Sequence, residues 1–294
     1  MREEANKHQK KYLRISVANK ILVLLCFLYL LLYVDRVNLS VAAASIKNEF
    51  HLSSTQLGLA FSAFGYGYAI FQIIGGWVGD RIGARRTLTF FLLFWGCVAI
   101  SIGFVNSLAT LIVARIALGI AEGAALPNAT RAISIWLPVE RRASAQGLVH
   151  GFSRFGTAIA APIIVTITLF FGTWRSAFWV LGGIGLIWAM VWAWYYRNTP
   201  RAHPGMSSAS TISDPSADSN VAPAVESVPW GPLIKRMSPT IGVWFCQGWT
   251  FWMFLSWIPL FLLTQYKIDL KSPAMFTACV FFSGVAGTWW EASL

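Results

Sequence analysis

The sequence contains few charged residues and few cysteines. Asp, Glu, Lys and Arg make up 12% of the 294 residues, whereas a soluble domain carries about 25%. The apolar fraction of 56% and the mean hydropathy of +0.58 exclude both a water-soluble globular protein and a disordered chain. The four cysteines are too few for a disulfide scaffold and show no metal-ligand spacing, so we expect no metal site. The chain is therefore predicted to be an integral membrane protein.

Apolar stretches long enough to cross a bilayer as helices, about 20 residues each, occur along most of the chain. They lie near 21–45, 57–79, 87–105, 108–137, 144–171, 177–196, 241–264 and 273–290. Residues 200–229 are rich in Pro, Ser and Ala and cannot bury a core, which indicates a flexible linker. We predict an all-α membrane protein with four parts. These are an N-terminal segment (1–20), a complete six-helix bundle (21–196), a linker (197–240) and an incomplete second bundle (241–294).

Lys and Arg gather in the N-terminal segment and in every second loop, and such residues mark the cytoplasmic side of a membrane protein. We therefore expect the N-terminus and the linker to be cytoplasmic and the protein to lie in the inner (plasma) membrane. Because the net charge of +11 sits in loops, it does not indicate nucleic-acid binding. A cleaved signal peptide is the alternative for the first apolar stretch, but cleavage would break the alternation of basic loops.

Several ionisable residues fall inside the predicted spans, where a charge is costly unless it pairs or faces water. They are Asp35, Arg36, Arg115, Glu122, Arg131 and Arg154. Arg115 and Glu122 are two helical turns apart on one face, and the helical rise places Arg115 level with Asp35 and Arg36. Arginines match a carboxylate ligand, and a carboxyl group beside a cation can exchange a proton. This pattern favours an anion and proton site, with fixed ion pairs between the first and fourth spans as the alternative.

Four motifs and one loop carry a family resemblance. Residues 76–86 are similar to the G-x-x-x-D-R-x-G-x-R-R loop between helices 2 and 3 of the major facilitator superfamily. Residues 33–38, 71–77, 115–128 and 136–143 resemble its anion:cation symporter family. The resemblance implies the major facilitator fold, with helix 7 and part of helix 8 present in the second bundle. It also implies proton-coupled symport of organic anions such as sugar acids, hexuronates or aromatic acids.

The resemblance implies roles for individual residues. Asp35 and Glu122 match the proton-coupling carboxylates, and Arg36 and Arg115 match the arginines required for the anion. Tyr68 matches a substrate-contacting tyrosine. Further candidate substrate ligands are Gln72 and Arg154, the latter with a structural role equally open. The candidate inner-gate residues, where glycines are expected to let helices 2 and 11 approach and charges to form a latch, are Gly76, Asp80, Arg81, Gly83, Arg85, Arg86, Arg131 and Glu140.

The residues of the predicted helix 7 do not identify the substrate. Residues 251–259 resemble the aromatic stretch of the family, but Trp244 and Gly248 stand where its sugar-acid members carry polar side chains. Gln247 is a candidate pore residue. His150 is interpreted as a packing residue.

We therefore predict a secondary active transporter that takes up an organic carboxylate with protons by alternating access. Its expected partners are the lipid bilayer and the anion, without a cofactor or nucleic acid, and no oligomeric state is predicted. An enzyme is disfavoured, because the sequence offers no nucleophile–base pair, metal cluster or phosphate loop.

A truncated, non-transporting membrane fragment or sensor is the alternative, since residues 289–294 do not continue the eighth stretch. Shifted reading frames of TGG TGG GA, which encodes Trp289, Trp290 and the start of Glu291, give Gly-Gly or Val-Gly. The family has a glycine-rich loop at this place, so we hypothesise a frameshift.

Overall fold

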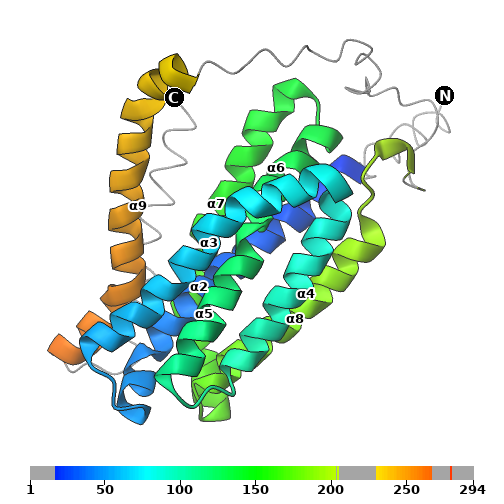
Figure 1. Ribbon diagram of the computed structural model, residues 1–294. Helices are drawn as coiled ribbons and strands as arrows, with labels where there is room; N and C mark the ends of the chain where they lie inside the picture. The colour runs from blue at the N-terminus through cyan, green and yellow to red at the C-terminus, as the bar shows by residue number, and fades with distance from the viewer. Residues whose placement is uncertain (1–16, 203, 205–229, 267–278, 280–294) are drawn as a thin grey trace.

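The structure is a computed structural model that describes residues 17–202, 204, 230–266 and 279 (Figure 1). Residues 1–16 of the predicted N-terminal segment, most of the predicted linker and all of the eighth predicted span except residue 279 lie outside this part. Within it, every regular element is helical, and seven segments are long and apolar enough to cross a membrane. The predicted all-α membrane fold is confirmed.

The helices follow one another as an up-and-down bundle. In chain order they are α2 (Val17–Glu49), α3 (Ser54–Ile82), α4 (Ala84–Ile102), α5 (Leu108–Gly123), α6 (Ala125–Trp136), α7 (Val139–Phe171), α8 (Arg175–Tyr195), a short 3₁₀ turn (Pro200–Ala202) and α9 (Trp230–Tyr266). Serine caps start two of them: Ser53 accepts from the backbone N–H of Gln56, and Ser107 from that of Thr110. Both caps belong to capping boxes.

The two largest differences from the predicted spans lie in the fourth and seventh stretches. The expected single helix over 108–137 is two helices that meet at Ala124. Pro127 explains the break, because it has no N–H to bond the carbonyl of Gly123 and its ring crowds that carbonyl. The seventh span begins at Trp230, inside residues predicted as linker. Pro232 is tolerated there, since first-turn N–H groups have no helical partner.

The helices pack in pairs, α2 against α7, α3 against α5 and α4 against α8 (Figure 1). α2 lies at the centre of the bundle, and all residues from Val34 to Ala43 are buried. α3 and α5 touch through their backbones. A Cβ on Gly119 would lie 2.1 Å from the carbonyl oxygen of Phe64, and one on Gly67 2.4 Å from that of Ile116. This contact fixes the level of α5, and of its charged residues, against α3.

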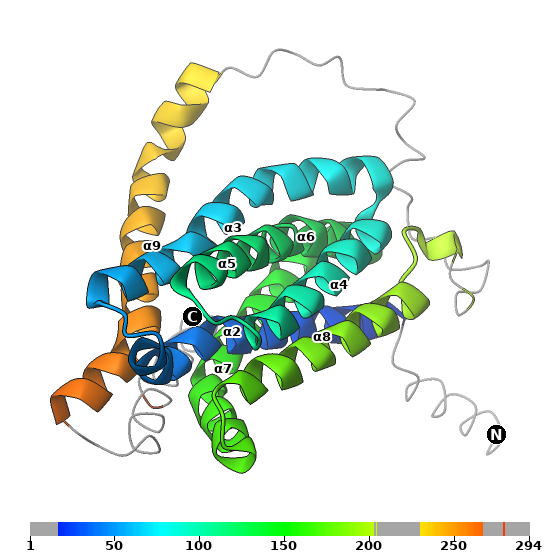
Figure 2. The ribbon, with the colours of Figure 1, turned by 60° about the horizontal axis from the view of Figure 1, so that its bottom comes forward.

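α9 meets the bundle near one end only. Ser40 Oγ of α2 donates a hydrogen bond to the carbonyl oxygen of Ser256 (2.8 Å), and Leu260 packs with Ala43 and Leu57. The opposite end of α9, from residue 231 to 247, is exposed, and it stands away from the other helices in Figures 1 and 2. The bundle is therefore closed by α9 at the end where α2 turns into α3.

Candidate functional site

Four charged side chains lie buried in the centre of the bundle. Their exposed fractions are 0% for Asp35, 7% for Arg36, 2% for Arg115 and 0% for Glu122. Arg36 Nε donates a hydrogen bond to Glu122 Oε2 at 2.8 Å, which forms an ion pair between α2 and α5. A buried charge is retained only where it is paired or has a function, so this cluster is the candidate site.

The helix periodicity brings these charges together. α5 buries Leu111, Arg115, Leu118 and Glu122, which are spaced three and four residues apart and so form one stripe. On α2, Asp35 and Arg36 lie in the fully buried run. Asp35 interacts electrostatically with Arg115, the second arginine of the stripe. We call Asp35, Arg36, Arg115 and Glu122 the central charge cluster.

Trp95 of α4 holds Asp35. Its indole Nε1 donates a hydrogen bond to Asp35 Oδ2 at 3.1 Å, and the ring is 1% exposed. Trp95 is not among the site residues predicted from the sequence. A signal was available, because a tryptophan at the middle of a span, away from the interfacial belts, needs a buried acceptor for its N–H.

Aromatic rings enclose Arg36. Its guanidinium carbon lies 4.4 Å from the ring centre of Tyr33, 4.6 Å from that of Tyr68 and 5.5 Å from that of Phe64. Trp252 of α9 covers another side at 5.7 Å. The rings favour a cation at this place and shield it from water. The structure thus brings Tyr68 to the central charge cluster, and its role as a substrate contact remains a prediction.

Much of the hydrogen-bonding capacity of the cluster is unused within the described part of the chain. Buried atoms without a hydrogen-bond partner there include Asp35 Oδ1, Glu122 Oε1 and both Nε and Nη1 of Arg115. Such atoms are costly to bury, so they indicate groups that a proton or a polar ligand would satisfy.

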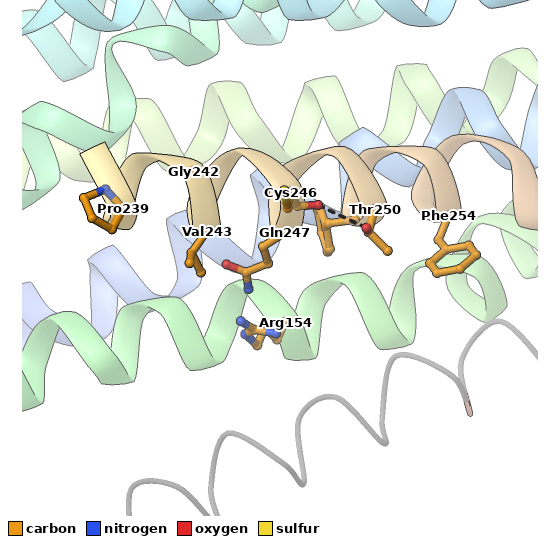
Figure 3. A pocket seen from close by; sticks show the side chains of 9 residues that line it. Arg154, Pro239, Gly242, Val243, Cys246, Gln247, Thr250 and Phe254 are labelled. Atoms are coloured by element: carbon orange, nitrogen blue, oxygen red, sulfur yellow. Dashed lines mark hydrogen bonds between the residues drawn. The ribbon is translucent and has the colours of Figure 1, made fainter. Parts of the chain in front are cut away.

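A second site with polar side chains lies between α7 and α9. A cavity of about 850 Å³ is lined there by Arg154 of α7 and by residues of α9 that include Gln247, Thr250 and Phe251. Figure 3 shows the Gln247 amide pointing toward Arg154 across this cavity. Thr250 Oγ1 donates to the carbonyl oxygen of Cys246. The other described residues that line it are mostly apolar.

The candidate inner-gate residues lie around the end of α3. Arg131 of α6 forms an ion pair with Asp80, as expected. Arg81 instead lies over the ring of Trp77, 3.9 Å from its centre. Glu140 is exposed, and the structure does not bring it to this pair.

The neighbouring motif residues tie α4 to the end of α8. Arg85 Nε donates to the carbonyl oxygen of Ala193 at 3.0 Å, and the Arg85 backbone N–H to Asn198 Oδ1 at 2.9 Å. Gly83 has a φ of +84°, a conformation that favours glycine, and a Cβ there would meet Asn198. Arg86 is exposed.

Gly76 faces α6, where a Cβ would lie 3.3 Å from Pro127. The expected approach of Gly76 to helix 11 remains a prediction. Asn128, the last residue of the motif at 115–128, donates to the carbonyl oxygens of Gly75 and Ala124 and so joins α3 to α6 at the helix break.

Comparison with known proteins decides the family. The profile of the Major Facilitator Superfamily matches residues 25–292. The chain belongs to the major facilitator superfamily.

Relatives within the superfamily are named as transporters of organic acid anions. A probable sulfoacetate transporter of Cupriavidus necator is 42% identical over 93% of this chain and 64% of its own length. The D-galactonate transporter of Escherichia coli O6:H1 is 32% identical, over 93% and 66%. The hexuronate transporter of Bacillus subtilis is 32% identical, over 87% and 59%. The chain therefore spans between 59% and 66% of the length of these relatives.

Solved structures of the superfamily share the fold. A bacterial homolog of the human lysosomal transporter Spinster, in an inward-facing and unoccupied conformation, has a TM-score of 0.70. It is 20% identical, over 90% of this chain and 60% of that one. A D-xylose-proton symporter has a TM-score of 0.67 at 18% identity, over 92% and 67%.

These findings confirm the predicted recognition, namely a multi-pass membrane protein of the major facilitator superfamily related to anion transporters. The relatives are named as transporters rather than enzymes, as predicted. They do not test the roles of single residues, which remain predictions.

Two further sequence candidates lie near the site without joining the central charge cluster. Gln72 is half-buried on α3, one turn from Tyr68, and has no hydrogen bond to other described residues. His150 of α7 packs edge-on against Tyr29, with ring centres 5.8 Å apart, and its Nε2 lies 3.2 Å from Gln146 Nε2. These contacts agree with the interpretation of His150 as a packing residue.

Proposed function

We propose that this chain carries the anion-binding and proton-binding bundle of a secondary active transporter, which takes up an organic acid anion together with protons by alternating access. The observation that carries the proposal is the buried Arg36–Glu122 ion pair, set beside Asp35 and Arg115 with unsatisfied polar atoms. The relatives named for sulfoacetate, galactonate and hexuronate support the substrate class.

In this proposal the anion and Glu122 compete for Arg36. Removing one partner of a buried ion pair costs about 3–5 kcal/mol, so Arg36 needs an anion at all times. Protonation of Glu122 removes the negative charge that pairs with Arg36. The guanidinium of Arg36 is then free to bind a carboxylate or sulfonate group of the substrate, and Arg115 provides the second donor. Asp35, held by Trp95, is the second carboxyl group that takes a proton.

The coupling follows from charge balance. With both carboxylates ionised, the central charge cluster is neutral, and an added anion would leave a net negative charge in the bilayer. Protonation of Glu122 or Asp35 offsets that charge. The protein therefore changes its access from one membrane face to the other more easily with both the anion and a proton bound than with the anion alone or the proton alone.

Two contacts at opposite ends of the bundle are suitable as the gates that alternating access requires. The Ser40–Ser256 hydrogen bond closes one end, and the Asp80–Arg131 ion pair lies at the other. We assign the first end to the outside and the second to the cytoplasm, with a cytoplasmic N-terminus and an inner-membrane location. The division into an N-terminal bundle, a linker and part of a second bundle belongs to the same proposal.

Gradient-driven uptake tests the proposal. The chain is reconstituted in liposomes, a pH gradient that is acid outside is imposed, and accumulation of radiolabelled sulfoacetate is measured. We expect accumulation that collapses when the gradient is dissipated. Asp35→Asn and Glu122→Gln are expected to abolish accumulation while sulfoacetate binding persists.

A matched control removes a carboxylate elsewhere. Glu49 pairs with Arg175 at 2.6 Å near the α2–α3 connection, outside the central charge cluster. Glu49→Gln should accumulate sulfoacetate as the wild type does. Equal accumulation in all three variants would remove Asp35 and Glu122 from the mechanism. Binding without uptake in the wild type would favour a sensor or a non-transporting fragment.

A further inference from the structure

Arg154 has no acidic partner in the described part of the chain, although it lies well inside a membrane-spanning helix. No carboxylate of that part comes within 4 Å of it, and the side chain is only half-buried. Its described basic neighbour is His150, one turn away on the same helix. A basic side chain within a span is expensive, so an unpaired one indicates a ligand.

The helix packing aims Arg154 at the cavity. Gly156 packs directly on α2, since a Cβ there would lie 2.7 Å from the carbonyl oxygen of Leu30. Arg154, two residues earlier, faces α9 instead, where Gln247 points toward it (Figure 3). An arginine fork and an amide across a space of about 850 Å³ are suitable ligands for one oxyanion group.

An aromatic pair connects this cavity to the central charge cluster. Phe251 lines the cavity and packs against Tyr33, with ring centres 6.5 Å apart. Tyr33 in turn lies on the guanidinium of Arg36 at 4.4 Å. The Tyr33–Phe251 pair therefore links the wall of this cavity, which Arg154 also lines, to the guanidinium of Arg36.

The charge of the site and the side chains that line the cavity indicate the chemical class of the ligand. The central charge cluster is neutral when ionised, and Arg154 adds one positive charge. Apart from Arg154 and Gln247, the described residues that line the cavity offer few hydrogen-bonding side chains, because the Thr250 hydroxyl is donated to a backbone carbonyl. A site of this kind does not satisfy a chain of sugar hydroxyls, which would be desolvated without partners.

We propose that Arg154 and Gln247 form a second anion-binding subsite, so that the substrate is a compact dianion with two acidic groups and few hydroxyls. One acidic group binds Arg36 and Arg115, and the other binds Arg154. This inference rests on the proposed function and specifies its substrate class.

The test compares a dianion with its two halves. The purified chain in lipid nanodiscs is titrated with sulfoacetate, acetate and methanesulfonate by isothermal calorimetry. We expect the wild type to bind sulfoacetate about tenfold or more tightly than either monoanion, since a charge-assisted hydrogen bond is lost with either half. Equal affinities for the three would overturn the inference without any variant.

Arg154→Gln should lower the affinity for sulfoacetate by about ten- to a hundredfold and leave that for acetate unchanged. Arg154→Lys, which keeps the charge, should lie between this variant and the wild type. The control is Lys235→Gln on α9, an exposed charge that does not line the cavity, and it should bind as the wild type does.

An equal loss of affinity for acetate and sulfoacetate in Arg154→Gln, or no loss for either, would contradict the dianion subsite while the proposed function stands. Tighter binding of galactonate than of sulfoacetate by the wild type would contradict it too. Absence of binding of every organic anion by the wild type would overturn the proposed function itself, and this inference with it.

Discussion

Neutralising Glu122 gives the most informative perturbation of the central charge cluster. In Glu122→Gln, the amide keeps the size of the side chain but no longer provides a negative charge for Arg36, to which Glu122 Oε2 accepts at 2.8 Å. Loss of the counter-charge should lower the free energy of unfolding of the ligand-free protein by about 3–5 kcal/mol. The anion then no longer competes with a carboxylate.

We therefore expect Glu122→Gln to bind sulfoacetate more tightly than the wild type at pH 8. A hydrogen bond to a charged group contributes about 1.5–3 kcal/mol, so the affinity should rise roughly ten- to a hundredfold. The wild-type affinity should increase as the pH falls, because binding takes up protons, whereas the variant should depend much less on pH. Bound anion should also restore the stability of the variant.

Calorimetric titration at pH 6 and pH 8, with thermal unfolding at each sulfoacetate concentration, measures these effects. Glu49→Gln serves as the control and should match the wild type in its sulfoacetate affinity and in the pH dependence of that affinity. The reasoning is refuted if Glu122→Gln binds sulfoacetate no more tightly than the wild type at pH 8 and keeps the same pH dependence. The Arg36–Glu122 pair would then be a fixed structural link between α2 and α5.

Two further predictions concern the scaffold of the site. Gly119→Ala should lower the unfolding temperature, at a cost of roughly 1–3 kcal/mol, because the added Cβ would lie 2.1 Å from the Phe64 carbonyl; Gly151→Ala, where a Cβ meets nothing, should be neutral or stabilising by about 0.5–1 kcal/mol. Trp95→Phe should cost about 1–3 kcal/mol in the same thermal assay, because Asp35 loses its indole donor; an unchanged unfolding temperature would show that this hydrogen bond contributes little.

The fold could be predicted from the sequence because the hydropathy and the charge of each segment depend directly on whether it lies inside or outside the bilayer. Span length, loop charge and the motif at 76–86 were sufficient for the seven spans and the superfamily. The ion pair between Asp80 and Arg131 followed from their places at two helix ends. The shared face of Arg115 and Glu122 followed from their seven-residue spacing, which does not depend on tertiary packing.

The pairing inside the cluster was less predictable. The helical rise placed Arg36 level with Arg115, yet its side chain forms the ion pair with Glu122, two turns along α5. Helix tilt and the reach of an arginine decide such a contact, and neither is visible in a one-dimensional depth estimate. Trp95 and Trp252 were missed for a related reason, since each acts through a helix distant in sequence. Pro127 indicates the helix break at Ala124, which the single predicted span over 108–137 does not contain.

The most direct test of the account is the proton balance of anion binding. Sulfoacetate is added to the purified chain in weakly buffered nanodiscs near pH 7.5, and the pH of the solution is followed with an indicator dye. The account predicts that the solution becomes more alkaline as the protein takes up protons with the anion, and that this signal is lost or strongly reduced in Glu122→Gln. Sulfoacetate binding to the wild type without any proton uptake would contradict it.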